Sequence, residues 1–498
     1  MRRSRVQGNR ELACSQRVRD SLRATLALRK FAIALLSCFL SRVYLLYCQD
    51  IETTNFTIFC YTHCMKILFV VPYTPNPIRV RPYELLRTLV RRGHTVTLAT
   101  LWQNEQERQE LGTLAALGIE IIADPLSKMR SLWNCVQALP SQAPLQAAYC
   151  WQPHFARQLY QVAGQRRFDV IHVEHLRGAR YGLALKEALA AVPGAPPIVW
   201  DSVDCISYLF AQAAKRSRSR SGRLMTTVEL ARTRRYEGWL LRQFDQVLVT
   251  SPNDRQALLA LAKPTPQAFQ TRANEATGQY GAPTTQANEP VAVLPNGVDL
   301  ESFRQDDQPK AEKTLVFSGK MSYHANVTAA LYLVQEIMPQ VWAHDPAVRV
   351  QLVGKDPPAP VRALADATTA PAGAVEVTGA VPTMRPYLSQ ATMAVAPVLY
   401  GAGIQNKVLE AMACGTPVIA SPSAASGLQA KRERDLIVAD DADAFATAIL
   451  SLLAQPARRA QIGQAGRAFV EQIHSWDAVG AQLEQYYQAT MRETDRTQ

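Results

Sequence analysis

Apolar runs of strand length alternate with helix-like stretches from residue 65 onward. Lys66 to Val71 is almost entirely apolar, which is typical of a strand buried on both faces of a parallel sheet. A helix is predicted from Pro82 to Arg92, with the proline in its first turn, and a second strand from Thr95 to Leu101. This βαβ unit predicts a doubly wound α/β sheet. Further strands are predicted at Ile119–Ile122, Val170–Val173, Ile198–Trp200 and Gln246–Thr250.

The same alternation begins again after Val291. Strands are predicted at Leu315–Ser318, Val348–Val353, Val375–Val377, Met393–Pro397, Val418–Ala420 and Ile437–Val438. Helices are predicted from Phe445 to Leu453 and from Trp476 to Tyr487, both on apolar periodicity. The chain has 498 residues, too many for one hydrophobic core. We therefore expect two α/β halves.

One stretch, GAGIQNKVLEAMACGTPVIAS at residues 401–421, combines a glycine turn, a helix and a strand. Gly401 and Gly403 precede a helix predicted from Asn406 to Cys414, which ends at Gly415. The first turn of a helix has unpaired N–H groups and the positive end of the helix dipole, so it stabilises a phosphate. Glycine lets the backbone come close to that phosphate. This stretch predicts an anion site.

Lys407 and Glu410 lie three residues apart in that helix and so share a face. An ammonium next to a diphosphate, with a carboxylate that accepts hydrogen bonds from ribose hydroxyls, suits a sugar nucleotide. The alternative is an exposed salt bridge worth under about 1 kcal/mol.

The segment GIQNKVLEAMACGTPVIAS, together with LPNGVDLESF at Leu294 to Phe303, resembles the donor half of family 4 GT-B glycosyltransferases. The nearest subgroup is the exosortase-associated (PEP-CTERM) sugar transferases. The similarity covers roughly Met65 to Tyr487 and is strongest after Val291. It implies two Rossmann-like domains that face a central cleft, the first for the acceptor and the second for the nucleotide sugar. It also implies transfer to a hydroxyl with retention, in glycan, exopolysaccharide or glycolipid synthesis, without a cofactor or an obligatory metal.

The resemblance assigns roles in the donor half, with two departures. Gly319 and Lys320 match the family's glycine and diphosphate-binding cation, whereas the second cation falls near Asn326, so Lys407 takes that role. The family pairs two glutamates eight residues apart; Glu410 matches the second, but the first falls on Ala402. Donor binding is thus expected at Gly319, Lys320, Gly401, Gly403, Asn406, Lys407 and Glu410, with Lys320 and Lys407 also catalytic.

Polar residues at predicted strand ends give the acceptor candidates, because open α/β sheets bind ligands at the carboxyl ends of their strands. In DVIHVEHL the family's second histidine falls on Glu174, between His172 and His175. Glu174 or His175 could hold an acceptor hydroxyl or act as base, and His172 is expected on the acceptor side as well. The alternative is that the histidines pack beneath a loop. Asp201 and Asp204 are candidates for acceptor contact or for capping the next helix.

Arg79 and Arg81 follow the first predicted strand, where the family's loop faces the cleft. They could contact an anionic acceptor, or form a solvated basic loop. The run KRSRSRSGR, from Lys215 to Arg223, has similar alternatives: a solvated loop, or contact with anionic lipid head groups or a lipid-linked diphosphate.

The predicted domains are an extension at 1–64, an acceptor-side domain at 65–300 with a flexible insertion at 264–290, a donor domain at 301–475 and a return helix at 476–498. Residues 1–64 hold ten Arg or Lys against four acids, which is half of the net charge of +12. Three interpretations stay open for them: upstream translation before a start at Met65, a membrane anchor, or a disordered appendage.

The charge and the cysteine content indicate which ligands and which cellular location to expect. Only four of the nine cysteines follow residue 64, and none has metal-site spacing, so we expect reduced thiols, no metal and a cytoplasmic protein, either free or peripheral on the inner face of the cell membrane. No nucleic-acid motif is present, and the expected partners are a UDP- or GDP-sugar and a glycan or lipid-linked acceptor. Three other functions remain open: a sugar-nucleotide epimerase, a non-catalytic sugar-nucleotide or glycan-binding protein, and a membrane-attached scaffold.

Overall fold

The computed structural model describes residues 64–216, 220–262, 290–306, 310–367, 370–400 and 404–497, without the side chains of 213–216, 220–226 and 495–497. Met1–His63 forms a separate unit from Cys64–Gln498, and the fold below is that of the second unit. Four predicted features therefore lie wholly or partly outside the described residues: the extension up to residue 63, the basic run at 215–223, the insertion up to residue 289, and the stretch 401–403.

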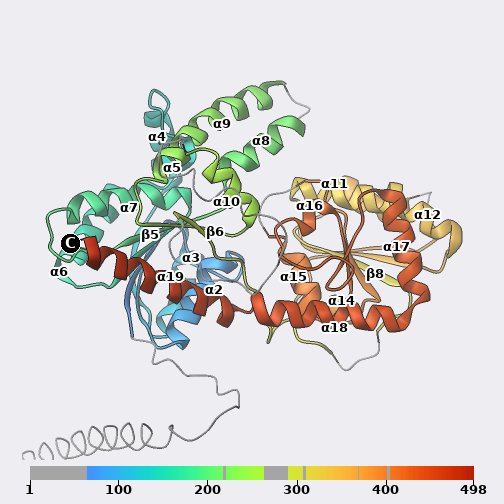
Figure 1. Cartoon of the computed structure of the whole chain (residues 1–498). Coiled ribbons are helices and arrows are strands. Elements are labelled where there is room, and N and C mark those ends of the chain that lie inside the picture. Colours follow the sequence, from blue (N-terminus) through green and yellow to red (C-terminus); the bar gives the residue numbers. More distant parts are fainter. Residues whose placement is uncertain are drawn as a thin grey trace, which may run out of the picture. The chain divides into compact units, whose positions relative to one another are not determined.

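Two parallel sheets confirm the predicted doubly wound α/β class (Figure 1). The first has the order β3-β2-β1-β4-β5-β6-β7 and the second β10-β9-β8-β11-β12-β13. The first sheet consists of β1 (Lys66–Val71), β2 (Thr95–Trp102), β3 (Glu120–Pro125), β4 (Val170–Glu174), β5 (Ile198–Val203), β6 (Gln246–Val249) and β7 (Val291–Val293). The second consists of β8 (Thr314–Ser318), β9 (Arg349–Val353), β10 (Val375–Gly379), β11 (Met393–Ala396), β12 (Val418–Ala420) and β13 (Ile437–Val438).

Helices cover both faces of each sheet (Figure 1). Those of the first half are α2 (Val80–Arg91), α3 (Glu105–Ala115), α4 (Lys128–Ala138), α5 (Leu145–Tyr149), α6 (Pro153–Gln165), α7 (His175–Leu189), α8 (Ile206–Arg216), α9 (Arg220–Leu240) and α10 (Pro252–Leu259). Those of the second are α11 (His324–Tyr332), a π-helical turn (Leu333–Ile337), α12 (Met338–His344), α13 (Ala359–Arg362), a 3₁₀ turn (Ala363–Asp366), α14 (Arg385–Gln390), α15 (Asn406–Ala413), α16 (Pro422–Ala425), α17 (Ala442–Ala454), α18 (Pro456–Ile473) and α19 (Trp476–Thr497). Among the described helices, none is both long and apolar enough to cross a membrane.

Central strands were predicted closely because burial on both faces leaves an uninterrupted apolar run. In β1, Ile67 to Val71 are fully buried. The edge strand β3 instead extends to Pro125, beyond the predicted Ile122. Proline is tolerated there because one side of an edge strand forms no hydrogen bonds to a neighbouring strand. The last helix also continues past the predicted Tyr487, through residues that are polar and carry no apolar periodicity.

Helix α19 belongs to the second half by sequence but packs on the first, beside α2 (Figure 1). Tyr487 of α19 lies in the same apolar cluster as β1. The carboxylate of Glu484 accepts from Arg92 Nε at 2.6 Å and contacts His94 Nε2 at 2.6 Å. Gln482 and Tyr486 both donate to the Val293 carbonyl. The end of the chain therefore fixes the edge of the first sheet.

Gly297 packs against the first residue of α19. A β-carbon at Gly297 would lie 2.5 Å from Cδ2 of Trp476, closer than any real contact. We expect Gly297→Ala to displace the indole and lower the free energy of unfolding by about 1–3 kcal/mol. Chemical denaturation measures this. Gly112→Ala in α3 is the matched control: a β-carbon there meets nothing within 4 Å, so stability should be equal or rise by about 0.5–1 kcal/mol. Equal stability of both variants would contradict the packing.

Candidate active site

Two glycines bring the ends of β8 and β9 together in the second half. A β-carbon at Gly354 would lie 1.7 Å from the Gly319 carbonyl oxygen, and the two residues have φ values of +153° and +142°. Only glycine combines this backbone with such close approach. Asn326 at the start of α11 donates from Nδ2 to the Lys320 carbonyl at 2.9 Å. The loop that carries Lys320 is thus held at the carboxyl end of the sheet.

Lys407 of α15 lies against this loop. Its Cε is 3.3 Å from the position of a β-carbon at Gly319, and its Nζ is 5.8 Å from the centroid of the Phe317 ring. The Nζ donates to Gln405 Oε1 at 3.1 Å. The Lys320 side chain is exposed. The structure therefore brings the loop of Lys320 and the side chain of Lys407 together, as the donor hypothesis requires.

Burial shifts the pKa values of Lys407 and Glu410 in opposite directions, and the charge of each residue opposes the shift of the other. Burial lowers the pKa of Lys407 to about 8, although Glu410 opposes the shift. Burial raises the pKa of Glu410 to about 7, although Lys407 opposes it. Within the described residues the two form no ion pair inside 4 Å, and the Glu410 carboxylate accepts no hydrogen bond. The alternative of an exposed salt bridge is therefore not found in that part of the chain, and both groups have unused capacity for a ligand.

The N-terminus of α15 also has unused hydrogen-bonding groups. Among the described residues, no side chain caps it at Gln405 and none is a hydrogen-bond partner of the buried Oδ1 of Asn406. The preceding Gly401 and Gly403 lie outside the described residues. Uncapped N–H groups at a helix start favour an anion, which agrees with the expected role of this turn.

An aromatic pair that we did not predict lies next to this turn. His324 Nδ1 contacts Tyr400 Oη at 2.9 Å, and their rings stack with centroids 5.3 Å apart. Tyr400 directly precedes the glycine turn at 401–403. The position of Tyr400 directly before this glycine-rich stretch was the one signal in the sequence that could have identified the aromatic pair.

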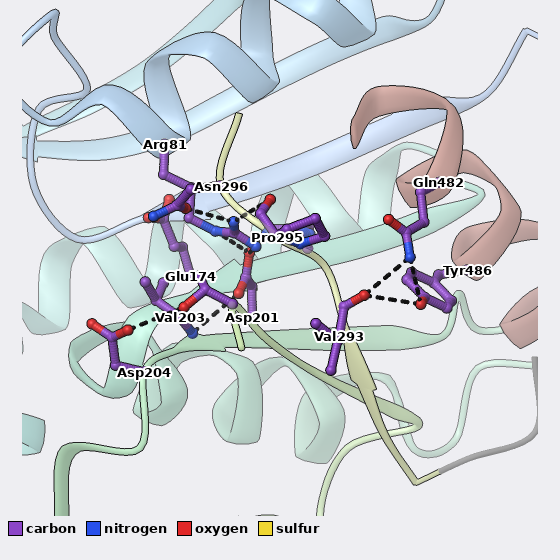
Figure 2. A network of polar contacts seen from close by, with 12 residues as sticks. Arg81, Glu174, Asp201, Val203, Asp204, Val293, Pro295, Asn296, Gln482 and Tyr486 are labelled. Atoms are coloured by element: carbon purple, nitrogen blue, oxygen red, sulfur yellow. Dashed lines mark hydrogen bonds and ion pairs between the residues drawn. The ribbon is translucent and has the colours of Figure 1, made fainter. Parts of the chain in front are cut away.

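In the first half, Arg81 and Asp201 form a buried ion pair. Arg81 Nη2 lies 2.7 Å from Asp201 Oδ2, with side chains 6% and 0% exposed. Figure 2 shows Arg81 also reaching the Pro295–Asn296 turn, where its Nη1 donates to Asn296 Oδ1 at 2.9 Å. Both residues were expected on the acceptor side. The structure instead uses them to join β5, α2 and the chain segment after β7.

His172 is likewise part of the packing. Its ring is fully buried, stacks on Phe69 at 4.1 Å and contacts Tyr487 Oη through Nδ1 at 2.9 Å. Burial, with the nearby Arg81 charge, holds its pKa well below the usual range. The expectation of acceptor contact by His172 is corrected, because an α19 side chain covers it. Tyr487 is 315 residues away in the sequence, so this contact could not be predicted from the local pattern around His172.

Glu174 and His175 stand at the carboxyl end of β4. Tyr73 Oη donates to Glu174 Oε1 at 3.0 Å, while Glu174 Oε2 is buried and has no hydrogen-bond partner in the described part of the chain. Burial, then the Asp201 charge, raises the pKa of Glu174 to about 8. His175 has a φ of 64°, and its Nδ1 accepts from the Arg177 amide at 3.3 Å, which leaves the proton on Nε2. Burial lowers the pKa of His175 to about 3, so this ring is neutral and suited to donate a hydrogen bond.

Asp204 is partly buried near the second half. Burial, then the Asp254 charge, raises its pKa to about 6, and it accepts from Thr250 Oγ1 at 3.2 Å. Its charge also contributes to the raised pKa of Tyr323, after burial and Tyr400. The alternative of helix capping by Asp201 or Asp204 is wrong, because Glu237 of α9 accepts from the Ile206 and Ser207 amides at the start of α8.

A cavity of about 120 Å³ lies beside Tyr73. Arg79 and Arg177 both line it, with Tyr149 and Glu107. Arg79 pairs with Glu107 at 3.2 Å, whereas Arg177 Nε is buried and has no partner among the residues that the structure describes. Of the two arginines predicted to face an acceptor, Arg79 therefore lines this cavity, and Arg81 is not among its lining residues. No motif in the sequence had indicated Arg177.

Two family models match the chain. "Glycosyl transferase 4-like domain" matches residues 78–268 and "Glycosyl transferases group 1" matches residues 312–455. Among solved structures, a glycosyltransferase from Rickettsia africae covers 86% of this chain with a TM-score of 0.58 and 12% identity, and 99% of that chain is covered. The structure of Anabaena HepE in complex with UDP and glucose matches 87% of this chain and 100% of its own chain, with a TM-score of 0.54 and 13% identity.

Curated relatives match over shorter stretches. A phosphatidyl-myo-inositol mannosyltransferase of Mycolicibacterium smegmatis is 31% identical over 205 residues, which are 39% of this chain and 51% of that enzyme. A GDP-mannose-dependent monoacylated alpha-(1-6)-phosphatidylinositol monomannoside mannosyltransferase of Corynebacterium glutamicum is 38% identical over 91 residues, 18% of this chain. The chain spans about half of the first enzyme and 24% of the second.

The two parallel sheets form the fold of the GT-B class, and each half matches a glycosyltransferase domain model. Within that class the chain belongs to the group 1, or family 4, glycosyltransferases.

Proposed function

We propose that the protein transfers a hexosyl group from a nucleotide sugar to a hydroxyl of a lipid-linked or glycan acceptor, with retention at the anomeric carbon. One observation carries the donor half of this proposal: Lys407 lies against Gly319, next to Lys320, with the Glu410 carboxylate unpaired among the described residues. The relatives' names support a hexosyl donor, and a GDP-sugar is the first to test.

The proposed donor site stabilises the charge of the departing diphosphate. Lys320 and Lys407 supply two ammonium groups, and the uncapped start of α15 supplies N–H groups. Lys407 is held by its contacts with the Gly319 loop and with Gln405, and the N–H groups by the helix, so these donors need little reorganisation as charge develops. Glu410 would accept hydrogen bonds from the ribose, as carboxylates do in dinucleotide sites.

We place the polar end of the acceptor in the cavity between Arg79 and Arg177. The Nε of Arg177, which has no partner in the described part of the chain, suits an anionic oxygen such as a phosphate. His175, with its proton on Nε2, would donate a hydrogen bond to a sugar or acceptor oxygen nearby. Glu174, whose pKa is about 8, would hold an acceptor hydroxyl and take its proton only when ionised.

A transfer assay tests this function. The full chain is incubated with radiolabelled GDP-mannose or UDP-glucose and a bacterial lipid extract, and label in the lipid or glycan fraction is counted. Label that depends on both protein and acceptor supports transfer. Nucleotide release without an acceptor favours the epimerase alternative, and donor binding without turnover favours a non-catalytic binding protein.

Donor affinity should have a narrow pH optimum. Lys407 must be protonated to attract the diphosphate, so affinity falls as pH rises through its pKa of about 8. Glu410 must be ionised to accept from the ribose, so affinity falls as pH drops through its pKa of about 7. Titration calorimetry with a nucleotide sugar measures both limbs, since its diphosphate does not itself titrate there. Lys407→Gln should remove the alkaline limb and Glu410→Gln the acidic one. Affinity that is flat between pH 6 and 9 in the unmodified protein would contradict these roles.

A further inference from the structure

The second half exposes large apolar side chains at one place, where two segments of the chain meet. Among the described residues of that half, Tyr323 and Leu399 are the only large hydrophobic residues that are exposed, at 42% and 40%. The Tyr323 ring lies 4.5 Å from the ring of His324, which in turn stacks on Tyr400, the residue after Leu399. We call Tyr323, His324 and Tyr400 the aromatic cluster. Aromatic rings left accessible beside polar groups are typical of small-molecule sites.

Hydrogen bonds hold the rings of the aromatic cluster in place. The Tyr400 hydroxyl contacts His324 Nδ1 at 2.9 Å and Thr328 Oγ1 at 3.3 Å. Thr328 Oγ1 also donates to the His324 carbonyl at 3.0 Å, which ties this network to the first turn of α11. Rings that are fixed before a ligand arrives lose little conformational entropy on binding, so the cluster is suited to recognise a ligand by shape.

The two segments that form the aromatic cluster also carry the proposed diphosphate site. The Lys320 carbonyl accepts from the Tyr323 amide at 3.1 Å and from Asn326 Nδ2 at 2.9 Å, so a tight turn fixes Tyr323 next to the loop of Lys320. Tyr400 directly precedes the Gly-Ala-Gly stretch at 401–403, which has no polar side chain of its own and leads into α15. A group attached to a diphosphate at the start of α15 is therefore expected beside the aromatic cluster.

We propose that the aromatic cluster holds the hexosyl ring of the nucleotide sugar. The faces of aromatic rings are electron-rich, and the C–H bonds on one face of a hexose present partial positive charge to them. Burial, then Tyr400 and the charge of Asp204 in the first half, raises the pKa of Tyr323. The cluster thus lies near the half in which we place the acceptor, as a sugar in transfer requires. This inference rests on the proposed function, because it adds the position of the sugar to the same donor site.

Titration calorimetry of the full chain tests the proposal by comparing a nucleoside diphosphate with its nucleotide sugar. The pairs are GDP with GDP-mannose and UDP with UDP-glucose, and the pair that binds the unmodified protein is used. Tyr323→Leu with His324→Leu should raise the Kd of the nucleotide sugar by about 3- to 10-fold, because both ring faces are lost. The Kd of the nucleoside diphosphate should change by less than about twofold. Tyr323→Phe keeps the ring and should keep both affinities within about twofold.

Tyr332→Leu is the matched control, because Tyr332 is a half-buried tyrosine at the other end of α11. It should leave both affinities unchanged. Lys407→Gln should weaken both ligands alike, since they share the diphosphate. Equal thermal melts show that the variants are folded.

Unchanged affinity of the double variant for the nucleotide sugar would overturn the proposal. An equal loss for both ligands would overturn it as well, because the cluster would then act on the diphosphate or on contact between the halves. If neither pair binds the unmodified protein, the donor site itself is refuted, and this inference with it.

Discussion

Lys407→Met lowers kcat for glycosyl transfer by about 10²- to 10³-fold, because it removes a fixed cation at the point where the diphosphate acquires charge. Methionine keeps most of the length and volume of the side chain, so the contact with Gly319 is preserved. Glu410 then lacks the cation that opposes its raised pKa, so less of it is ionised at neutral pH. The loss should therefore appear in donor affinity as well as in kcat.

Steady-state kinetics with the donor that proves active measure this effect. Lys431→Met is the matched control, because Lys431 is an exposed lysine of the same half and lies outside the proposed site. It should change kcat by less than about twofold. Equal kcat for Lys407→Met and Lys431→Met would remove Lys407 from the donor site.

Arg81→Met lowers the free energy of unfolding by about 3–5 kcal/mol, because it leaves the fully buried carboxylate of Asp201 without its cation. Burial already raises the pKa of Asp201, and Arg81 is the group that opposes this shift most strongly. The variant also loses the hydrogen bond to Asn296, so the turn after β7 is affected. We expect a large effect on stability from a residue that the sequence had suggested for acceptor binding.

Urea denaturation, followed by tryptophan fluorescence, measures this loss. The double variant Arg81→Met with Asp201→Leu is the control, since it removes both charges and should recover most of the stability. A loss below about 1 kcal/mol in Arg81→Met would show that the ion pair contributes no more than a surface pair does.

The fold could be predicted because parallel strands buried on both faces leave a local signal. β1 and β12 lie within one residue of their predicted limits, and each is an uninterrupted apolar run. Helix α15 was found from its stop at Gly415, where φ is +64°. The polar end of α19 carries no such local pattern, so its length was underestimated.

The two sites differed in how far the sequence could describe them. The proposed donor residues lie on one short helix and one loop, so spacing and resemblance together were enough to suggest Lys320 and Lys407. The acceptor side depends on contacts between distant segments: Arg81 with Asp201, and His172 with Tyr487. A charged residue at a strand end looks the same in sequence whether it meets a ligand or a buried partner. Only tertiary packing distinguishes the two.

A crystal structure of the protein with a bound nucleoside diphosphate tests the central claim most directly. The account predicts that the diphosphate lies at the start of α15, within hydrogen-bond distance of Lys407 Nζ and near Lys320, with the ribose hydroxyls on the Glu410 carboxylate. A nucleotide bound elsewhere, with Lys407 still paired to Gln405, would contradict it.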